Sequence, residues 1–304
     1  MFISKVLVNL PKKIHPPTGH PEIHRWTAYF QRSRRIEHRC GWLPTHRRDR
    51  LVVLNERFDR KLDYLFIDES GQVSLADLVA LGVSARNIVL LGDQMQLAHP
   101  TPGTHPGESG KSTLDYFLSG QDTVPGHQGI FLGTSYRMHP SICEFISEAV
   151  YEGRLLADDA NARQKLLGGP GSSQQFPETG IKFIEVEHDN CSQSSEDEAQ
   201  MVLDLYEELL GCRYVDRDGV SHDMTPDDVM VVAPYNAQVN LIKEKLDKVG
   251  GVRDARVGTI DLFQGQEAQL VIVSMTTSNR EELPRYFEFL FSRNRLNVAL
   301  SRAR

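Results

Sequence analysis

Two short, mostly apolar segments that end in polar turns most constrain how this chain can fold. Leu62–Ile67 runs into the pair Asp68-Glu69, and Asn87–Leu91 leads to Asp93. Strands without alternating polar residues are typical of parallel sheets that helices cover on both faces. The carboxyl ends of such strands lie at one edge of the sheet, which is where their ligands bind. We therefore expect an α/β fold with its chemical groups at that edge.

Later segments extend the same pattern. Ser74 is a good N-cap for a short helix, and Ser195 with Glu198 three residues later forms the pattern of a capping box. The expected further strands are Ile181–Val186, Val229–Ala233, Arg256–Ile260 and Leu270–Met275, and the expected helices are Ser74–Leu81, a stretch within Ser135–Gly153, Ala237–Val249 and Arg293–Arg304. The pattern predicts two stacked α/β units.

Composition narrows the class of protein. A chain of 304 residues with 40% hydrophobic and 25% charged residues can bury a substantial core and predicts about two domains. No apolar run approaches the roughly 20 residues that span a bilayer, so we expect no membrane segment. The four cysteines are widely scattered without a CxxC pair. This pattern favours a reducing, cytoplasmic setting and argues against a zinc or iron–sulfur site.

Charge is unevenly distributed along the chain. Residues 1–60 hold 13 Lys/Arg against 5 Asp/Glu, whereas the whole chain carries a net charge of −7. Three interpretations of this segment stay open: a basic arm for nucleic acid, a poorly ordered tail, or the product of a disrupted reading frame. A zinc site built from the histidines of this segment and Cys40 is disfavoured by its single cysteine and irregular spacing. The composition changes near residue 60, which we expect to be a domain boundary.

The strand-end polar groups suit nucleotide hydrolysis. Such a site needs one acid to hold Mg²⁺ and a second to orient and deprotonate the attacking water, and Asp68 and Glu69 supply this pair. Asp93 and Gln96 follow the neighbouring strand, and a glutamine there can bond a γ-phosphate or its water. An acidic turn after a core strand is also common without any function. The two elements side by side favour the functional interpretation.

Arginines and a glycine-containing turn add to this set. Arg137 in "SYRMHP" carries a permanent planar charge that suits phosphate oxygens, and the strand of "VGTIDLFQGQE" passes into a polar turn holding Gly265 and Glu267. In "RNRLNVALSRAR", Arg295 and Arg302 lie seven residues apart and would share one helix face. Each arginine alone is more often a solvated surface charge.

Taken in order, six segments resemble conserved motifs of superfamily 1 helicases. They are "DESGQ", "GDQMQL", "SYRMHP", "APYNAQ", "TIDLFQGQE" and "NVALSRAR", and they span about residues 61–304. The resemblance is greatest to helicases of the nonsense-mediated-decay type and to bacterial helicases fused to RecB-like nucleases. It implies a RecA-like P-loop NTPase fold. Residues 61–133 would form the second half of a first RecA-like domain, and residues 134–304 nearly all of a second.

The resemblance also implies roles for single residues. Catalytic roles fall to Glu69 as base, Gln96 as γ-phosphate sensor, and Arg137 and Arg302 as arginines that reach across the domain interface. The implied nucleotide-binding residues are Asp68, which would hold Mg²⁺ through water, and Asp93, Tyr136, Gly265 and Glu267. The implied contacts to a nucleic-acid backbone are Pro234, Tyr235, Asn236, Gln238 and Thr259.

The sequence departs from the family pattern in places. Ser70 and Gln94 stand where many relatives have Ala and Pro, and both changes look tolerable. Nothing upstream of Asp68 matches the phosphate-binding loop. The segment "HPGESGKST" resembles such a loop, but His105 occupies the position of its first glycine and no apolar strand leads into it. We expect that Lys111 does not bind phosphate.

We therefore predict the later portion of an ATP- and Mg²⁺-dependent helicase that translocates 5′→3′ on single-stranded DNA or RNA, monomeric, and inactive without its upstream helicase or nuclease portion. One alternative is a non-catalytic module that grips single strands and uses its basic first 60 residues as an arm. The other is a P-loop kinase built on Lys111.

Overall fold

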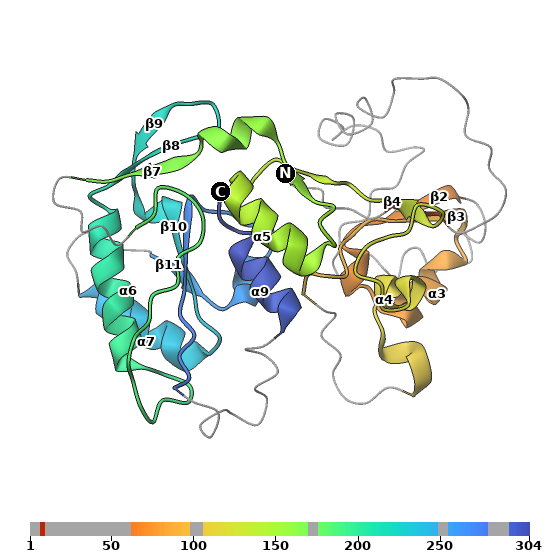
Figure 1. Cartoon of the computed structure of the whole chain (residues 1–304). Coiled ribbons are helices and arrows are strands. Elements are labelled where there is room, and N and C mark those ends of the chain that lie inside the picture. Colours follow the sequence, from red (N-terminus) through yellow and green to blue (C-terminus); the bar gives the residue numbers. More distant parts are fainter. Residues whose placement is uncertain (1–6, 10–61, 98–105, 170–175, 249–254, 279–291) are drawn as a thin grey trace, which may run out of the picture.

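The computed structural model describes residues 7–9, 62–97, 106–169, 176–248, 255–278 and 292–304. Figure 1 shows two lobes with helices α5 (Pro140–Val150) and α9 (Arg293–Leu300) between them. We call residues 7–9 and the described part of 62–133 the first lobe, and the described part of 134–304 the second lobe. No helix of the described residues is long and apolar enough to cross a membrane.

The first lobe is built on a four-stranded sheet with the order β2-β3-β1-β4. The strands β2 and β3 pair in parallel and align Ile67 with Leu90, so both end at the same edge, as expected. The sheet as a whole is mixed, because β1 pairs antiparallel with β3 and with β4. Ile67 and Leu90 pack with Leu78 and Leu114 from the helices of this lobe. The elements are β1 (Leu7–Asn9), β2 (Leu62–Ile67), β3 (Ala85–Leu90), β4 (Gly129–Ile130), α3 (Leu75–Gly82), η3 (Gly107–Gly110) and α4 (Thr113–Leu118).

The strand ends of this sheet lie unusually close together. Ser70, fully buried in the turn η2 (Ser70–Gln72), donates its backbone N–H and its hydroxyl to the Leu91 carbonyl at 2.9 and 2.8 Å. A Cβ atom on Gly71 would lie 2.7 Å from the backbone oxygen of Asp93, and one on Gly92 would lie 2.8 Å from the Ser70 nitrogen. The two glycines and the small serine therefore let the two strand-end turns touch.

The second lobe is centred on the strand β10 (Val229–Val232), which pairs in parallel with β11 (Arg256–Gly258) and β12 (Leu270–Val273). All four of its residues are buried. Its odd-numbered valines face the helices α6 (Glu196–Leu209) and α7 (Asn236–Asp247), and its other side chains face α9 and η6 (Ile260–Phe263). This confirms the expected parallel sheet that is covered on both faces.

Short elements connect this core to the first lobe. A parallel pair, β5 (Thr134–Ser135) and β6 (Leu156–Ala157), flanks α5 and leads into the turn η4 (Asp159–Arg163). A second small sheet is antiparallel and consists of β7 (Lys165–Leu167), β8 (Arg213–Val215) and β9 (Ser221–Asp223), followed by η5 (Pro226–Asp228). Strands of two or three residues leave little sequence pattern, and none of these was predicted.

One predicted strand and one predicted capping box are wrong. Residues 181–186 form no strand, and Phe183 is 83% exposed, because no described strand pairs with this apolar segment. Ser195 does cap α6 by accepting the Glu198 N–H at 3.2 Å. The Glu198 carboxylate does not return to Ser195, however, but accepts the Thr276 N–H at 2.8 Å and contacts His188. A tertiary contact has thus replaced the local capping box.

Several expectations lie outside the described residues. They concern the basic segment 1–60 apart from 7–9, with its histidines and Cys40, and His105 of the segment that resembles a phosphate loop. The remaining predicted helices and strands of the second lobe are confirmed within a few residues at their ends. Arg293–Arg304 is the main exception, because α9 ends at Leu300 and the chain then continues to a bridge between Ala303 and Ala268.

Gly71→Ala should destabilise the protein by about 1–3 kcal/mol, because its new methyl group would overlap the rigid Asp93 carbonyl. The free energy of unfolding from urea titration measures this. Gly126→Ala is the matched control, since a Cβ atom there meets nothing within 4 Å. An equal effect of both substitutions would contradict the proposed close contact of the strand-end turns.

Candidate active site

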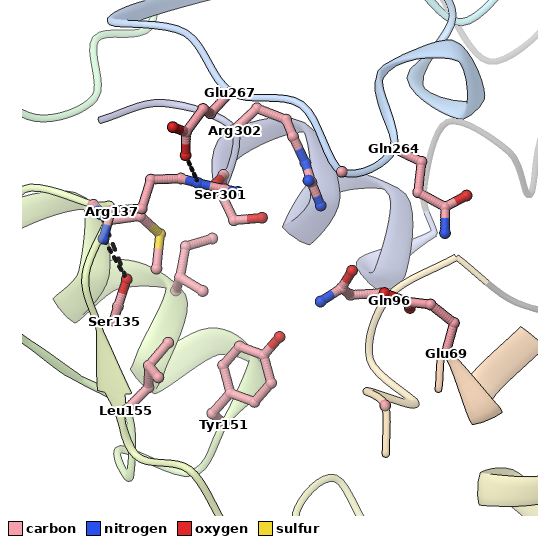
Figure 2. A pocket seen from close by; sticks show the side chains of 14 residues that line it. Glu69, Gln96, Ser135, Arg137, Tyr151, Leu155, Gln264, Glu267, Ser301 and Arg302 are labelled. Carbon is pink, nitrogen blue, oxygen red and sulfur yellow. Dashed lines mark hydrogen bonds and ion pairs between the residues drawn. The ribbon is translucent and has the colours of Figure 1, made fainter. Parts of the chain in front are cut away.

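A pocket of about 520 Å³ opens between the two lobes. Figure 2 shows Glu69, Gln96 and Gln264 on one side of it, Ser135, Arg137 and Glu267 on the other, and Arg302 between them. Its volume lies in the range of small-molecule sites. Tyr151, Leu155 and Ser301 complete the labelled part of its wall. The pocket thus collects polar side chains from segments far apart in the sequence.

Glu69 reaches the pocket from the end of β2. Its backbone has φ 52° and ψ 41°, the left-handed conformation that non-glycine residues rarely adopt. Its N–H is held at 2.8 Å by the Asp68 carboxylate. Asp68 itself does not line the pocket. The strained backbone thus lies where only the second of two adjacent carboxylates lines the pocket, and strain of this kind often marks functional sites.

Gln96 is held by a buried hydrogen-bond network that joins the lobes. Its amide donates to Asp93 at 2.9 Å, and the Tyr151 hydroxyl donates to the same carboxylate oxygen at 2.6 Å. Asn297 of α9 donates to the Tyr151 oxygen at 2.9 Å and to the Met95 carbonyl at 2.8 Å. The network therefore links the turn after β3 to α5 and α9.

A second asparagine of α9 strengthens this contact. Asn294 donates to the carbonyls of Gln94 and Gln96 at 2.9 and 2.7 Å. Met95 and Leu97 of the same turn pack into the hydrophobic clusters of the second lobe. At the departures from the family pattern, the Gln94 Nε2 bonds the Gln121 carbonyl at 3.1 Å but its buried Oε1 accepts no hydrogen bond from the described residues, whereas the Ser70 hydroxyl is bonded.

Burial changes the ionisation of this network. Desolvation raises the pKa of Asp93 above its ordinary 3.8, although the hydrogen bonds from Tyr151, Gln96 and Met95 oppose it. Desolvation and the nearby Asp93 also raise the pKa of Tyr151 well above 10.0. Asp93 was predicted to bind nucleotide. The structure instead places it behind the pocket wall, where its oxygens serve Gln96 and Tyr151.

Arg137 lies on the opposite wall, 7% exposed. Its Nε donates to Glu267 at 2.9 Å and its Nη1 donates to the Ser301 carbonyl at 2.8 Å. Desolvation lowers the pKa of Arg137, and the ion pair with Glu267 opposes this. Burial alone would raise the pKa of Glu267, but its ion pairs with Arg304 and Arg137 bring it below 4.5. Glu267 is therefore ionised at neutral pH and forms an ion pair with the Arg137 guanidinium.

Arg302 is the most unusual group in the pocket. It is 4% exposed, and its guanidinium donates to the carbonyls of Val298 and Gln266 at 3.1 and 3.2 Å. Among the described residues, no carboxylate forms an ion pair with it within 4 Å. Desolvation and the nearby Arg137 lower its pKa to about 10. Glu69 and Glu267 favour its charged form, but only through longer-range attraction. Burying a charge without a counter-ion in direct contact is costly, so a wall of this kind favours an anionic ligand.

The structure brings six of the predicted nucleotide-site residues together around the pocket: Glu69, Gln96, Arg137, Gly265, Glu267 and Arg302. Gly265 has φ 75°, which its turn requires. Tyr136 does not line the pocket; it is 55% exposed and the Arg217 guanidinium lies 5.9 Å from its ring centre. Arg295 does not reach the pocket either, because it pairs with Asp261 at 3.0 Å.

The residues predicted to contact nucleic acid separate into two groups. Pro234, Tyr235 and Asn236 follow the end of β10, and Thr259 follows β11 at the same edge of the sheet. Gln238 is fully buried, with its amide bonded to the backbone of Ser195 and to the Ser274 hydroxyl. This interior position does not suit a contact to a nucleic-acid strand.

Sequence reasoning missed Tyr151, Ser135, Ser301, Asn294 and Asn297. Tyr151 lies in an apolar helical pattern that gives no sign of its buried hydroxyl network. The spacing of Asn294 and Asn297 was visible, since residues three apart share one helix face. Two uncharged amides before a cluster of arginines nevertheless carry no specific signal by themselves.

The structure supports rejecting the "HPGESGKST" segment as a phosphate loop. Gly107–Gly110 forms the short helix η3, and Lys111 pairs with Glu108 and does not line the pocket. The Ser112 hydroxyl accepts the Asp115 N–H at 3.1 Å as the N-cap of α4. The groups that would bind phosphate are thus used in local structure, which disfavours a kinase built on Lys111.

Tyr151→Phe should lower the free energy of unfolding by about 1–3 kcal/mol, because Asp93 and Asn297 would each lose a buried partner. Chemical denaturation measures the loss. Tyr206→Phe is the control, since this residue is also buried but its hydroxyl makes only a 3.4 Å bond to Pro226. Equal losses would show that the Tyr151 hydroxyl is not specially engaged.

Asp93→Asn should change how stability depends on pH. The folded pKa of Asp93 is raised, so its favourable contribution is complete below 3.8 and is lost as the pH rises through the folded pKa. The stability of the wild-type protein relative to Asp93→Asn should therefore fall with rising pH above 3.8. A difference that stays constant with pH would contradict a raised pKa.

Comparisons with known proteins show which families this chain is similar to. A family model described as "AAA domain" matches residues 112–304. The chain is 31% identical over 261 residues to DNA polymerase alpha-associated DNA helicase A of Saccharomyces cerevisiae, covering 80% of this chain and 37% of that protein. It is 28% identical to the ATP-dependent helicase NAM7 of the same yeast (82% of this chain, 25% of that protein) and to DNA-binding protein SMUBP-2 of Rattus norvegicus (80% and 24%).

The chain thus spans about a quarter to a third of the length of these relatives. The expected similarity to helicases fused to RecB-like nucleases stays a prediction. The α/β architecture, the parallel pairs β2-β3, β10-β11 and β10-β12, and the matched model agree with the predicted RecA-like P-loop fold. Identity at this level over four fifths of the chain, together with the matched domain, shows that the chain belongs to the superfamily 1 helicases, a family of ATP-hydrolysing enzymes.

Proposed function

We propose that the pocket between the lobes is the nucleotide site of an ATP-dependent helicase. The observation that carries this proposal is the buried Arg302, which lines the pocket without a described carboxylate partner. An anionic ligand such as a triphosphate would supply the missing counter-charge. The names of the relatives, which include an ATP-dependent helicase and a DNA helicase, favour the same ligand.

The proposed roles follow from the positions of the side chains. Glu69 accepts a proton from the attacking water, and Gln96 orients that water or the γ-phosphate from the same wall. Arg137 and Arg302 stabilise the negative charge that develops on the transferred phosphoryl group. Glu267 keeps Arg137 in place through its ion pair.

Mg²⁺ would be held by Asp68 together with phosphate oxygens and water. The described residues contain no group of three or more His, Cys, Asp or Glu side chains that could hold a metal alone. This fits Mg²⁺, which is usually bound through one or two carboxylates plus substrate phosphates and keeps several waters. When bound, the ion would neutralise part of the charge on the β- and γ-phosphates.

A single nucleic-acid strand would pass the ends of β10 and β11. Pro234, Tyr235, Asn236 and Thr259 lie at that edge and offer backbone, hydroxyl and amide groups that hold phosphates without reading sequence. Gln238 would support this edge from the interior. We further propose 5′→3′ movement and a monomeric protein, with either DNA or RNA as the strand.

The proposed domain organisation is two RecA-like domains with the nucleotide site between them. Residues 61–133 would form the latter half of the first RecA-like domain, and residues 134–304 the second. The change from the β2-β3-β1-β4 sheet to the second lobe after β4 supports a boundary there. Residues 1–60 contain no glycine–lysine phosphate loop, and this segment stays open as an arm, a tail or a product of another frame.

We expect residues 1–304 alone to show little ATP turnover, because the lysine that clamps the β- and γ-phosphates is missing from the sequence. The same residues joined to an upstream segment with a phosphate loop should hydrolyse ATP when single strands are added. Glu69→Gln should lower that turnover by about 10²–10⁴-fold. A phosphate-release assay measures both.

Two outcomes would contradict this. Strand-stimulated turnover by residues 1–304, abolished by Glu69→Gln, would show that no upstream loop is needed. Strand binding without any nucleotide dependence, in both forms of the protein, would favour the non-catalytic binding module. Lys111→Ala serves as the control, because Lys111 pairs with Glu108 and should not affect turnover.

A further inference from the structure

The segment that carries Arg137 into the pocket has an unusual backbone. Residues 136–139 lie between β5 and α5 in no helix or strand. Yet the carbonyls of all four consecutive residues 135–138 accept hydrogen bonds from side chains elsewhere in the second lobe. We propose that Asn161 and Gln164 are positioning residues that hold this backbone and thereby aim the Arg137 guanidinium. This inference rests on the proposed role of Arg137.

Asn161 makes the largest contribution. It is fully buried, and its Nδ2 donates to the Ser135 carbonyl at 3.0 Å and to the Met138 carbonyl at 3.1 Å. Its Oδ1 atom is buried and accepts no hydrogen bond from the described residues. The amide therefore acts here as a donor alone, and it bridges the first and last carbonyls of the segment.

Gln164 and Arg217 hold the two carbonyls in between. The Gln164 Nε2 donates to the Arg137 carbonyl at 2.8 Å from a side chain that is 5% exposed. The Arg217 Nη1, from the turn between β8 and β9, donates to the Tyr136 carbonyl at 3.1 Å. Arg217 is more exposed than the two amides, so we expect a smaller contribution from it.

The turn η4 places both amides. Its N-cap Asp158 accepts the Ala160 N–H at 3.1 Å and donates its own N–H to Ser135 at 2.9 Å. Asn161 lies within this turn and Gln164 directly follows it. Since β6, which precedes the turn, pairs with β5, the amides and the carbonyls they bond are held in one compact unit.

This arrangement has an electrostatic consequence at the pocket. Ser135, Arg137 and Met138 line the pocket, whereas Asn161 and Gln164 do not. The negative ends of four carbonyl dipoles are therefore bonded to groups outside a site that we propose binds phosphate. The guanidinium is left as the main charge that this segment presents. A guanidinium that is already held in position does not have to reorganise when negative charge develops on the transferred phosphoryl group.

The test is NMR of arginine side chains in the 304-residue chain, without nucleotide. The Arg137 Nε–H is held by Glu267 at 2.9 Å and should give a protected signal, which Arg137→Lys assigns by its loss. The Arg302 Nε–H, bonded to Val298 at 3.1 Å, is the internal reference. Asn161→Asp replaces the donor by an acceptor, and Gln164→Met removes a single bond. Asn240→Asp and Gln200→Met, at exposed positions of α7 and α6, are the matched controls.

We expect hydrogen exchange at the Arg137 Nε to become at least about tenfold faster in Asn161→Asp and Gln164→Met, while the Arg302 signal stays unchanged. Unchanged Arg137 exchange, or an equal change of both arginines, would overturn the proposal, because the latter indicates a general loss of structure. If Asn161→Asp does not fold, Gln164→Met decides alone.

Titration with inorganic pyrophosphate separates this inference from the proposed function. Shifts of the Arg137 and Arg302 signals in the wild type would support phosphate binding at the pocket. The same titration is made on residues 1–304 joined to an upstream segment with a phosphate loop. If pyrophosphate leaves both signals unchanged there as well, while Arg137 exchange is still faster in the two variants, the proposed nucleotide site is wrong and the positioning roles of Asn161 and Gln164 stand.

Discussion

The contact between α9 and the turn after β3 is the constraint on which the site depends. Asn294 and Asn297 bond the carbonyls of Gln94, Met95 and Gln96, while Met95 and Leu97 pack into the second lobe. Backbone carbonyls are obligatory acceptors, so three consecutive ones bonded by a neighbouring helix define a specific alignment. This contact places the walls of the pocket, which belong to different lobes, opposite each other.

The same contact relates the two chemical halves of the pocket. The turn at residues 92–97 lies directly against the turn that follows Glu69, because Gly71 contacts Asp93 and Gly92 contacts Ser70. Its other side is bonded to α9 through Asn294 and Asn297. Beyond the end of that helix lies Arg302. A shift of Gln96 would thus have to move either the carboxylate side or the arginine side. Coupling of this kind suits a motor in which nucleotide state is passed between two domains, which is the function we propose.

Much of the fold was predictable because it rests on local pattern. The strand β2 and the pairing of its end with that of β3 follow from continuous apolar runs, and Ser74 and Ser195 act as the caps that their residue type favours. Ile181–Val186 has the same apolar character but forms no strand, because a strand needs a partner and sequence pattern does not supply one. Similarly, the Glu198 carboxylate does not complete the capping box but accepts the N–H of Thr276, a residue distant in sequence.

The sequence by itself determined the parallel α/β architecture, the order of the helicase-like motifs and the identity of the charged groups, because these depend on residue type and short spacing. Only the tertiary structure decided which of those groups share a pocket. In the folded protein the pocket is lined by Glu69, Gln96, Arg137, Glu267 and Arg302. Asp93 and Gln238 are instead buried behind the surface, and Lys111 forms an ion pair with Glu108. The physical reason is that burial and partner choice are set by contacts between distant segments, which residue type alone does not specify.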